Sequence, residues 1–474
     1  MVTVQIPRHR VDGGRCGWLG GAGLVLTVQA LAAQAVPVPA DTVRLTLDAA
    51  LHRATVAAPE LRIAGAALRR ADGELSEARA PLRNRLVPSL DASLSYQRLV
   101  QNQYDAIARR FATGPGPELA PDPLTTVFNA RNALTIAVAA TIVPFDGGVA
   151  AAEARAAQAM REQVRAGWQQ AKAQLELDVT TTYHDAVLSR RVEAIAESTL
   201  AQAARVLAIA EASVAQGRAP AFEASRARAA LEAQRPALAL ARTARELADM
   251  RLRQLTGASS AAVLVLADSL EAAPGDMAGQ AEMPTAAGFA LARRQELLGV
   301  AAADARLAAA RRRQLPRLAL TATHQRFAYP GSAGLGWTAF FPNTVLSAIV
   351  SVPVDLTGRA AGAIAAAAGA LDERRERATL AVRRAEHAEL AARRAASDAA
   401  EALRAACAGD AAAAQAFAIA EVRFAAGRSS ALEAQDARLA LATARLQRAR
   451  AARDLQVALA RLARLERLPL VEGA

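Results

Sequence analysis

Four segments of the chain alternate apolar and polar residues with a period of two, which is typical of strands that bury one face. They span residues 89–96, 134–143, 318–325 and 345–352. In the first segment, Leu90, Leu94 and Tyr96 share one face and serines the other. The fourth segment alternates less cleanly, and which face it buries stays open. Long polar or Gly/Pro-rich loops at 99–133 and 326–344 join the segments in pairs. The pattern therefore predicts two β-hairpins, at about 86–145 and 317–355.

The other strongly periodic stretches are helical. After each hairpin, about 70 residues without proline lead to Gly217 and to Gly427, which is enough for a helix roughly 105 Å long. A second helix follows each glycine, at 222–255 and 432–465. The glycines are therefore expected to mark the turns of helical hairpins at 147–256 and 358–467. Shorter helices, at about 47–83 and 284–313, precede the β-hairpins.

The second helices carry two further signals. Pro236 removes a helical hydrogen bond and predicts a kink. Leu432, Leu439 and Leu446 recur every seven residues and, with the leucines at 455, 459 and 462, predict a coiled-coil-like seam. Abundant alanine beside this seam allows neighbouring helices to approach to the lower end of about 8–10 Å.

The same order of predicted elements occurs twice because the sequence contains an internal repeat. Residues 209–231 return as 419–441, a shift of about 210 positions, so each copy holds several elements. The matches outside alanine are Ile209/Ile419, Glu211/Glu421, Gly217/Gly427, Arg218/Arg428, Glu223/Glu433, Arg228/Arg438 and Leu231/Leu441. We therefore divide the chain into a first repeat at 36–256, a linker at 257–283 and a second repeat at 284–474, behind an N-terminal segment at 1–35.

That N-terminal segment reads as a secretory signal peptide. Arg8, Arg10 and Arg15 precede an apolar run at 18–33, and a small-x-small cleavage site ends at Ala35. The alternative is a single membrane anchor, which is disfavoured because no basic stop-transfer cluster follows. Cys407 is then the only cysteine after the signal, which excludes an internal disulfide or a cysteine zinc site. We expect Cys407 to pack as a small apolar residue on a helix.

The net charge of +12 and the pI near 10.9 invite a nucleic-acid interpretation. The arginines are, however, interleaved with acidic residues along every helical stretch, as on solvated helix faces. Nucleic-acid binding is therefore disfavoured. The histidines His52, His184, His324 and His387 are isolated, and no phosphate loop or nucleophile elbow is visible. The sequence predicts no enzyme and no cofactor.

Aromatic residues gather in the two hairpins, as at the interface girdles of membrane strands. Four strands from one chain are too few to close, since membrane barrels begin at about eight strands. No run of 18 or more apolar residues follows the signal, so no transmembrane helix is predicted and only a closed barrel could span a membrane. Three chains supplying twelve strands would be the smallest symmetric assembly with a lumen. The alternative is a soluble sheet core with ordinary aromatic packing. The aromatics concerned are Tyr96, Tyr104, Phe111, Phe128, Phe145, Phe327, Tyr329, Trp337, Phe340 and Phe341.

The chain resembles the TolC-like outer-membrane efflux factor family over essentially its whole mature length. The resemblance rests on the turns Pro144-Phe145-Asp146-Gly147-Gly148 and Pro353-Val354-Asp355, on Val87-Pro88 and Leu315-Pro316 before the first strands, and on the glycine turns. It implies a homotrimer in the outer membrane, with a twelve-stranded β-barrel continuing into a twelve-helix α-barrel across the periplasm. It also implies a periplasmic adaptor and an inner-membrane transporter as partners, and a passive exit duct as the function.

The resemblance further assigns residues at the helix tips. Glu223, Glu433 and Asp436 match the acidic rings that set cation preference at the periplasmic constriction, although aspartates are common at the first two positions. Glu223 and Glu433 are explained equally well as first-turn residues that complement the helix dipole. The adaptor contacts are expected at Gly217 and Arg218 and at Gly427 and Arg428.

Two other functions stay open. A secreted or periplasmic coiled-coil scaffold without channel activity would show the same long helices. A duct that serves protein secretion instead of small-molecule efflux would share the whole pattern, because the inner-membrane partner selects the cargo.

Overall fold

The computed structural model describes residues 42–98, 100, 132–260, 262–268, 289–328, 340–426 and 428–470. All of them belong to one compact unit, Thr42–Ala474. The predicted signal peptide and Gly427 lie outside the described residues, as do the loop aromatics Tyr104, Phe111, Phe128, Tyr329 and Trp337.

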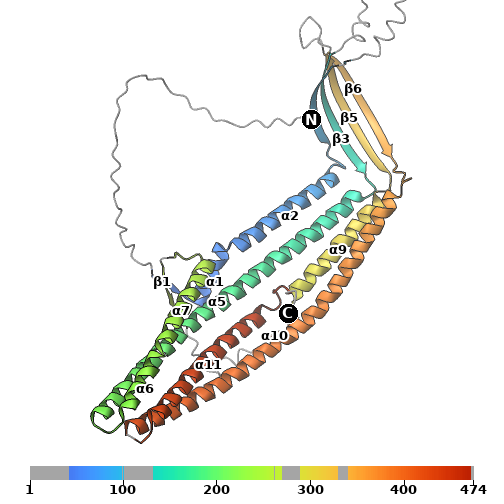
Figure 1. Cartoon of the computed structure of the whole chain (residues 1–474). Coiled ribbons are helices and arrows are strands. Elements are labelled where there is room, and N and C mark those ends of the chain that lie inside the picture. The colour runs from blue at the N-terminus through green and yellow to red at the C-terminus, as the bar shows by residue number, and fades with distance from the viewer. Residues whose placement is uncertain are drawn as a thin grey trace, which may run out of the picture. The chain divides into compact units, whose positions relative to one another are not determined.

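The elements follow the predicted plan twice (Figure 1). The helices are α1 (Leu47–Ala57), α2 (Pro59–Arg83), α5 (Val149–Ala215), α6 (Ala221–Glu232), α7 (Arg235–Thr256), α9 (Ala290–Arg312), α10 (Arg359–Ala425) and α11 (Ala431–Arg464). The strands are β1 (Thr42–Leu45), β2 (Ser89–Arg98), β3 (Asn132–Phe145), β4 (Val263–Leu266), β5 (Arg317–Ala328) and β6 (Phe341–Ser351). The long helices α5 and α10 both have 67 residues, which corresponds to about 100 Å each.

The four hairpin strands form one antiparallel sheet in the order β2-β3-β5-β6. Its register places Leu90 beside Ala140, then Ala322 and then Leu346, so these four residues share a face. The same face carries Leu94, Tyr96, Leu134, Ile136, Val138, Ile142, Leu318, Leu320, Ala348 and Val350, and we call it the apolar face. Toward the loops it also carries His324, Arg326 and Thr344. The register thus decides the side on which β6 places Leu346 and Val350, which the sequence left open.

The opposite side, the polar face, carries most of the hydroxyl and amide side chains, together with Phe327, Phe341, Val345 and Ile349. Its polar residues include Ser89, Asp91, Ser93, Ser95, Gln97, Thr135, Thr141, Thr321, Thr323, Gln325, Asn343, Ser347 and Ser351. Leu90 and Leu94 are each 71% exposed and Leu346 is 80% exposed, so nothing in the described chain covers the apolar face there. The edge strands β2 and β6 each pair with one neighbour only among the described strands.

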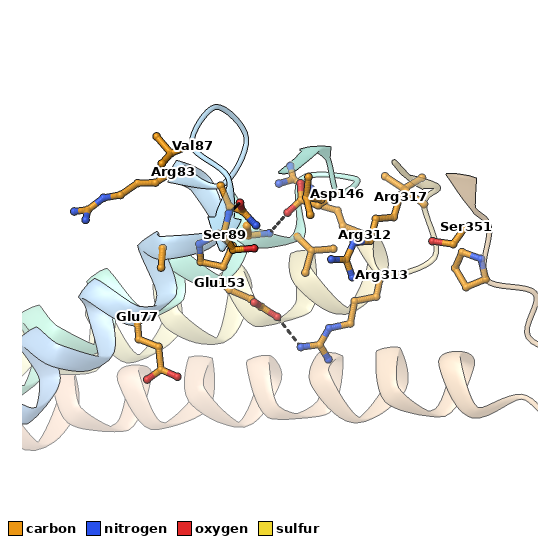
Figure 2. Close-up of a pocket in the computed structure, with 18 of the residues that line it drawn as sticks. Glu77, Arg83, Val87, Ser89, Asp146, Glu153, Arg312, Arg313, Arg317 and Ser351 are labelled. Carbon is orange, nitrogen blue, oxygen red and sulfur yellow. Dashed lines mark hydrogen bonds and ion pairs between the residues drawn. The ribbon is translucent and has the colours of Figure 1, made fainter. Parts of the chain in front are cut away.

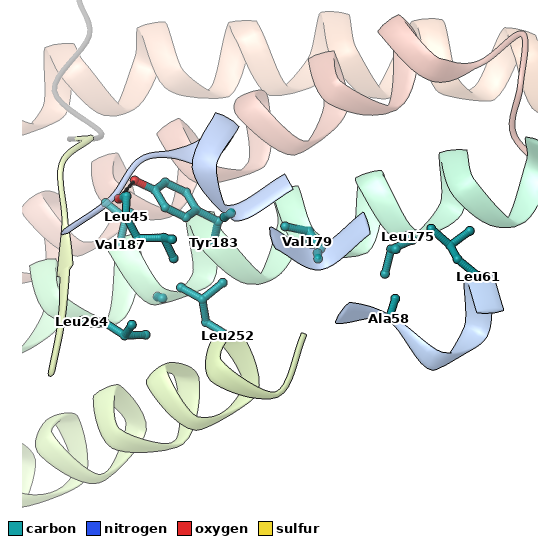
Figure 3. Close-up of a cluster of buried hydrophobic side chains, with 12 residues drawn as sticks. Leu45, Ala58, Leu61, Leu175, Val179, Tyr183, Val187, Leu252 and Leu264 are labelled. Carbon is teal, nitrogen blue, oxygen red and sulfur yellow. Dashed lines mark hydrogen bonds between the residues drawn. The ribbon is translucent and has the colours of Figure 1, made fainter. Parts of the chain in front are cut away.

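A small parallel sheet, which the sequence analysis missed, anchors the first repeat. The apolar run after Thr256 was expected to be part of a linker, but its residues Val263–Leu266 form β4 and pair with β1. Figure 3 shows the surrounding core, where Leu45, Leu264 and Leu252 pack on the middle of α5 around Tyr183. The Tyr183 hydroxyl lies 2.7 Å from Asp268 Oδ2 and 3.1 Å from the Leu45 carbonyl. Burial and the Asp268 carboxylate raise the pKa of Tyr183 above its usual range, so the hydroxyl remains a donor.

Two helices expected to be continuous are divided. The segment expected as one helix at 47–83 breaks at Ala58, which is extended (φ −62°, ψ 120°) because the following Pro59 disfavours a helical conformation. The segment at 222–255 breaks at Ala233–Gln234, and Pro236 lies in the first turn of α7, where its missing N–H costs nothing. The kink therefore falls just before Pro236. The equivalent α11 has no proline and is continuous over 34 residues.

The predicted leucine seam of α11 is wrong in part. Leu432 and Leu439 are 40% and 39% exposed, whereas the buried residues of α11 are Ala434, Arg438, Leu441, Ala449, Ala451, Ala452 and Leu455. Alanine fills this face because helix axes that lie close together leave room for little more than a methyl group. Cys407 of α10 packs against the cluster of Leu403, Ala452 and Leu455, as expected for a small apolar residue.

Of the helices that the structure describes, none combines the length and the hydropathy needed to cross a lipid bilayer.

We predict that Tyr183→Phe lowers the free energy of unfolding by about 1–2 kcal/mol, because it leaves the buried Leu45 carbonyl and the Asp268 carboxylate without the hydroxyl. Tyr96→Phe is the matched control, since its hydroxyl bonds Asn132 on an exposed surface. Thermal denaturation of both variants in the same detergent measures the effect. Equal midpoints for the two variants would show that the Tyr183 contacts do not stabilise the core.

Candidate functional site: the strand-to-helix turns and the helix tips

The turn from β3 into α5 is built around Asp146. Its carboxylate accepts hydrogen bonds from Gly148 N (2.9 Å) and Ala150 N (2.7 Å), two donors that the helix itself leaves unpaired. Gly147 and Gly148 have φ of +68° and +80°. A Cβ on Gly147 would lie 2.8 Å from Leu315 Cβ and 3.0 Å from the Arg312 carbonyl, so only glycine fits this turn. Pro144 lies within the last residues of β3.

In the turn from β6 into α10, an aspartate again accepts hydrogen bonds from the first turn of the helix, but the surrounding residues differ. Asp355, two residues after Pro353, accepts hydrogen bonds from Thr357 N (3.1 Å), Arg359 N (3.2 Å) and Ala360 N (2.7 Å). Gly358 precedes the helix with φ of +72°, and no atom lies within 4 Å of a Cβ built there. The second turn is therefore open where the first is packed.

The two carboxylates differ in their surroundings. Burial alone would raise the pKa of Asp146, but the hydrogen bonds from Ala150 and Gly148 and the Arg85 guanidinium, 2.9 Å away, outweigh it and lower the pKa. The pKa of Asp355 is lowered mainly by the Ala360 hydrogen bond, opposed by desolvation and assisted by Thr357. Asp355 has no arginine partner among the described residues. Only the first turn is therefore reinforced by an ion pair.

The connections between sheet and helices line one cavity of about 930 Å³ (Figure 2). Its strand residues are Ser89, Val143, Arg317 and Ser351. Ser89, Arg317 and Ser351 lie on the polar side of the sheet by register, whereas Val143 lies in the irregular end of β3. Ser89 and Ser351 belong to the two opposite edges. The cavity therefore extends across the helix end of the sheet on its polar side.

The helix tips contain the same backbone motif twice. In the first tip (residues 216–220), Arg218 N donates to the Ser213 carbonyl and Gly217 N to the Val214 carbonyl, with Gly217 at φ +66°. This is the Schellman pattern of helix ends. In the second tip (residues 426–430, without Gly427), Arg428 N donates to the Arg423 carbonyl, which is the equivalent bond. The tips place Arg218 and Arg428 at matching positions.

The three acidic residues predicted at the constriction differ in their local surroundings. Glu223 lies in the first turn of α6 and Glu433 in the first turn of α11. The Glu433 amide bonds Ser430 Oγ, and its carboxylate lies 3.4 Å from Arg423. Asp436 is exposed, and among the described residues its carboxylate has no hydrogen-bond or ion-pair partner. Local structure thus accounts for Glu433 and leaves Asp436 without a structural role.

Sequence reasoning missed the environment of Arg438. Its side chain is 1% exposed, and Nη1 donates to the Thr199 carbonyl of α5 at 2.9 Å, with burial lowering its pKa. Its repeat counterpart Arg228 is largely exposed and pairs with Glu211 at 2.8 Å. The internal repeat shows that Arg228 and Arg438 occupy equivalent positions, but no local sequence pattern indicates which of the two is buried.

These features define a class of protein with two repeats, each with a β-hairpin that continues through a capped turn into a long helical hairpin. A family model described as outer membrane efflux protein matches residues 50–258 and 290–465. The chain belongs to this family, and both the expected resemblance and the fold class are confirmed.

Solved structures show the same fold at low sequence identity. The fold of CusC matches with a TM-score of 0.71 and 17% identity, covering 91% of this chain and 97% of that one. The outer membrane protein VceC from Vibrio cholerae matches with a TM-score of 0.69 and 17% identity, covering 89% and 96%. The CmeC outer membrane channel of Campylobacter jejuni matches with a TM-score of 0.67 and 15% identity, covering 90% and 87%. No curated protein sequence gives a significant match.

We predict that Asp146→Asn lowers the free energy of unfolding at pH 7 by about 1–2 kcal/mol, because hydrogen bonds to a charged acceptor are replaced by weaker ones. The folded pKa of Asp146 is lowered, so its stabilisation is present above 3.8 and is lost as the pH falls through the folded value. The wild type should therefore lose more stability than the variant between pH 7 and that range. Chemical denaturation at a series of pH values measures this.

Asp355→Asn is the matched control for the ion pair. It removes the same kind of cap without an arginine partner, so its loss at pH 7 should be smaller than that of Asp146→Asn. A larger loss for Asp355→Asn would show that the additional hydrogen bonds from Thr357 and Arg359 stabilise the second turn more than the ion pair with Arg85 stabilises the first.

Proposed function

We propose that three copies of this chain assemble into an outer-membrane exit duct, which passes substrates from an inner-membrane transporter to the exterior. The observation that carries this proposal is the sheet, which is apolar and uncovered on one face and mainly polar on the other. A membrane barrel needs apolar side chains outward and polar ones toward the lumen.

The sheet edges support the threefold assembly. β2 and β6 present rows of backbone N–H and C=O groups without a strand partner in the described chain. Lipid cannot hydrogen-bond such groups, so an edge within a membrane must pair. If β6 of one copy pairs with β2 of the next, three copies of a four-stranded sheet close with twelve strands. Membership of the outer membrane efflux protein family supports the same assembly.

The helices then extend into the periplasm, where the two tips meet the adaptor. Gly217, Arg218 and Arg428, together with Gly427, are the proposed adaptor contacts. A drug or small-molecule efflux system and a type I secretion system both fit this duct.

Purified protein in planar bilayers tests the proposal. We expect discrete conductance steps, a band in unheated gel electrophoresis at three times the chain mass that heating removes, and recovery in outer-membrane fractions. A protein that stays soluble without detergent and gives no conductance would instead be a periplasmic coiled-coil scaffold.

We predict that Asp436→Asn reduces the cation selectivity of this pore, because threefold symmetry turns each exposed carboxylate into a ring of three charges. Glu433→Gln should have a smaller effect, since Arg423 already offsets its charge. Reversal potentials in a salt gradient measure the selectivity. Glu74→Gln on α2 is the control for loss of a charge outside the tips. If Asp436→Asn and Glu74→Gln gave equal reversal potentials, Asp436 would have no role in cation selectivity.

A further inference from the structure

The cavity at the strand-to-helix turns carries positive charge that its acidic residues do not balance. The lining acids are Glu77, Asp146 and Glu153. Asp146 is held by Arg85 and by the first turn of α5, and Glu153 pairs with Arg313 at 2.7 Å. In Figure 2, the Glu77 carboxylate points away from the turn residues. No lining acid is therefore left to neutralise a further arginine.

Two further arginines from the α9–β5 connection line the same cavity. Arg312 donates Nη1 to the Gly148 carbonyl at 3.1 Å, a neutral acceptor that leaves its charge uncompensated. Arg317 lies on the polar side of the sheet, opposite Ser351, and its guanidinium has no hydrogen-bond or ion-pair partner among the described residues. Figure 2 shows Arg312, Arg317 and Ser351 on the same side of the cavity. Guanidinium groups bind carboxylates and sulfonates through paired N–H donors.

Apart from Arg83, Asn84, Ser89 and Ser351, the rest of the lining is apolar. It consists of Ala80, Pro81, Val87, Pro88, Val143, Val149, Ala150, Leu315, Val352 and Pro353. A volume of about 930 Å³ falls in the range of small-molecule sites, roughly 300–1,000 Å³. A ligand that satisfies both parts of this lining has an apolar body and one anionic group. A small hydrated anion leaves the apolar part unsatisfied, and a neutral amphiphile leaves the arginines unsatisfied.

We propose that this cavity is a binding subsite for amphiphilic organic anions, carboxylates or sulfonates, with Arg312 and Arg317 as the anchoring residues. The subsite rests on the proposed function for its location: the polar face of the sheet lines the inside of the proposed duct, so the occupant of the subsite is passing cargo and not membrane lipid. Threefold assembly places three such subsites around the lumen at one level.

Titration of purified full-length protein in detergent with naphthalene-2-sulfonate, followed by calorimetry, tests binding. We expect Arg317→Gln to weaken binding roughly tenfold, as for loss of one charge-assisted contact. Naphthalene-2-sulfonamide, with the same body and no charge, and inorganic sulfate, with charge and no body, should each bind more weakly than naphthalene-2-sulfonate. Arg317→Gln is the cleaner variant, because Arg312 also supports the turn through Gly148.

Arg83→Gln is the matched control. It removes one charge from the same lining, but in Figure 2 the Arg83 side chain points away from Arg312 and Arg317. We expect its affinity to equal that of the wild type. Equal losses in Arg83→Gln and Arg317→Gln, unchanged affinity in Arg317→Gln, or equal binding of the sulfonamide would each overturn the proposal.

Planar bilayers separate this proposal from the duct itself. We expect the sulfonate to reduce the single-channel current of the wild type more than that of Arg317→Gln. Conductance without charge-dependent binding refutes the subsite and leaves the duct standing. Charge-dependent binding by a protein that forms no channel supports the subsite and refutes the duct.

Discussion

The rest of the structure depends on one contact, the capping of each 67-residue helix by an aspartate just beyond the preceding strand. The carboxylate satisfies helix N–H groups at the point where the sheet ends, so strand direction and helix direction are fixed together. Glycines with positive φ permit the sharp change of path. Because both repeats use this device, each strand register is coupled directly to the placement of a helical hairpin.

The turns also concentrate charged side chains at the helix end of the sheet. The connections from both sheet edges line one cavity on the polar side of the sheet, while the apolar face is uncovered. In water alone, an uncovered face with leucines more than two-thirds exposed would be a liability. Against lipid the same face is favourable. In the cavity, Asp146 and Glu153 are already paired with Arg85 and Arg313, so Arg312 and Arg317 keep their charge uncompensated.

The two repeats have diverged where their surroundings differ. Asp146 gains an ion pair with Arg85, whereas Asp355, among the described residues, accepts hydrogen bonds only from backbone N–H groups and the Thr357 hydroxyl. Arg438 is buried against α5, whereas its counterpart Arg228 is exposed beside Glu211. The first repeat alone packs against the small β1–β4 sheet, which fixes the middle of α5 through Tyr183. Identical residues at equivalent positions of the two repeats thus make different contacts.

The sequence by itself determined the features whose causes lie within a few residues. Period-two alternation located the four hairpin strands, and proline-free stretches located the long helices. The Pro-x-Asp turns and the tip glycines followed from local backbone preferences. The break before Pro59 follows from the same local rules, because a proline disfavours a helical conformation in the residue before it, but it was missed.

Tertiary structure alone decided which faces these elements bury. The pairing of β1 with β4 joins segments more than 200 residues apart, and Arg438 meets Thr199 across a separation of 239. The polarity of β6 was fixed by its register with β5, and the packing face of α11 by the close approach of its neighbours instead of by its leucine spacing. Local propensity acts over one or two turns of chain, whereas burial and charge balance depend on groups that only the folded chain brings together.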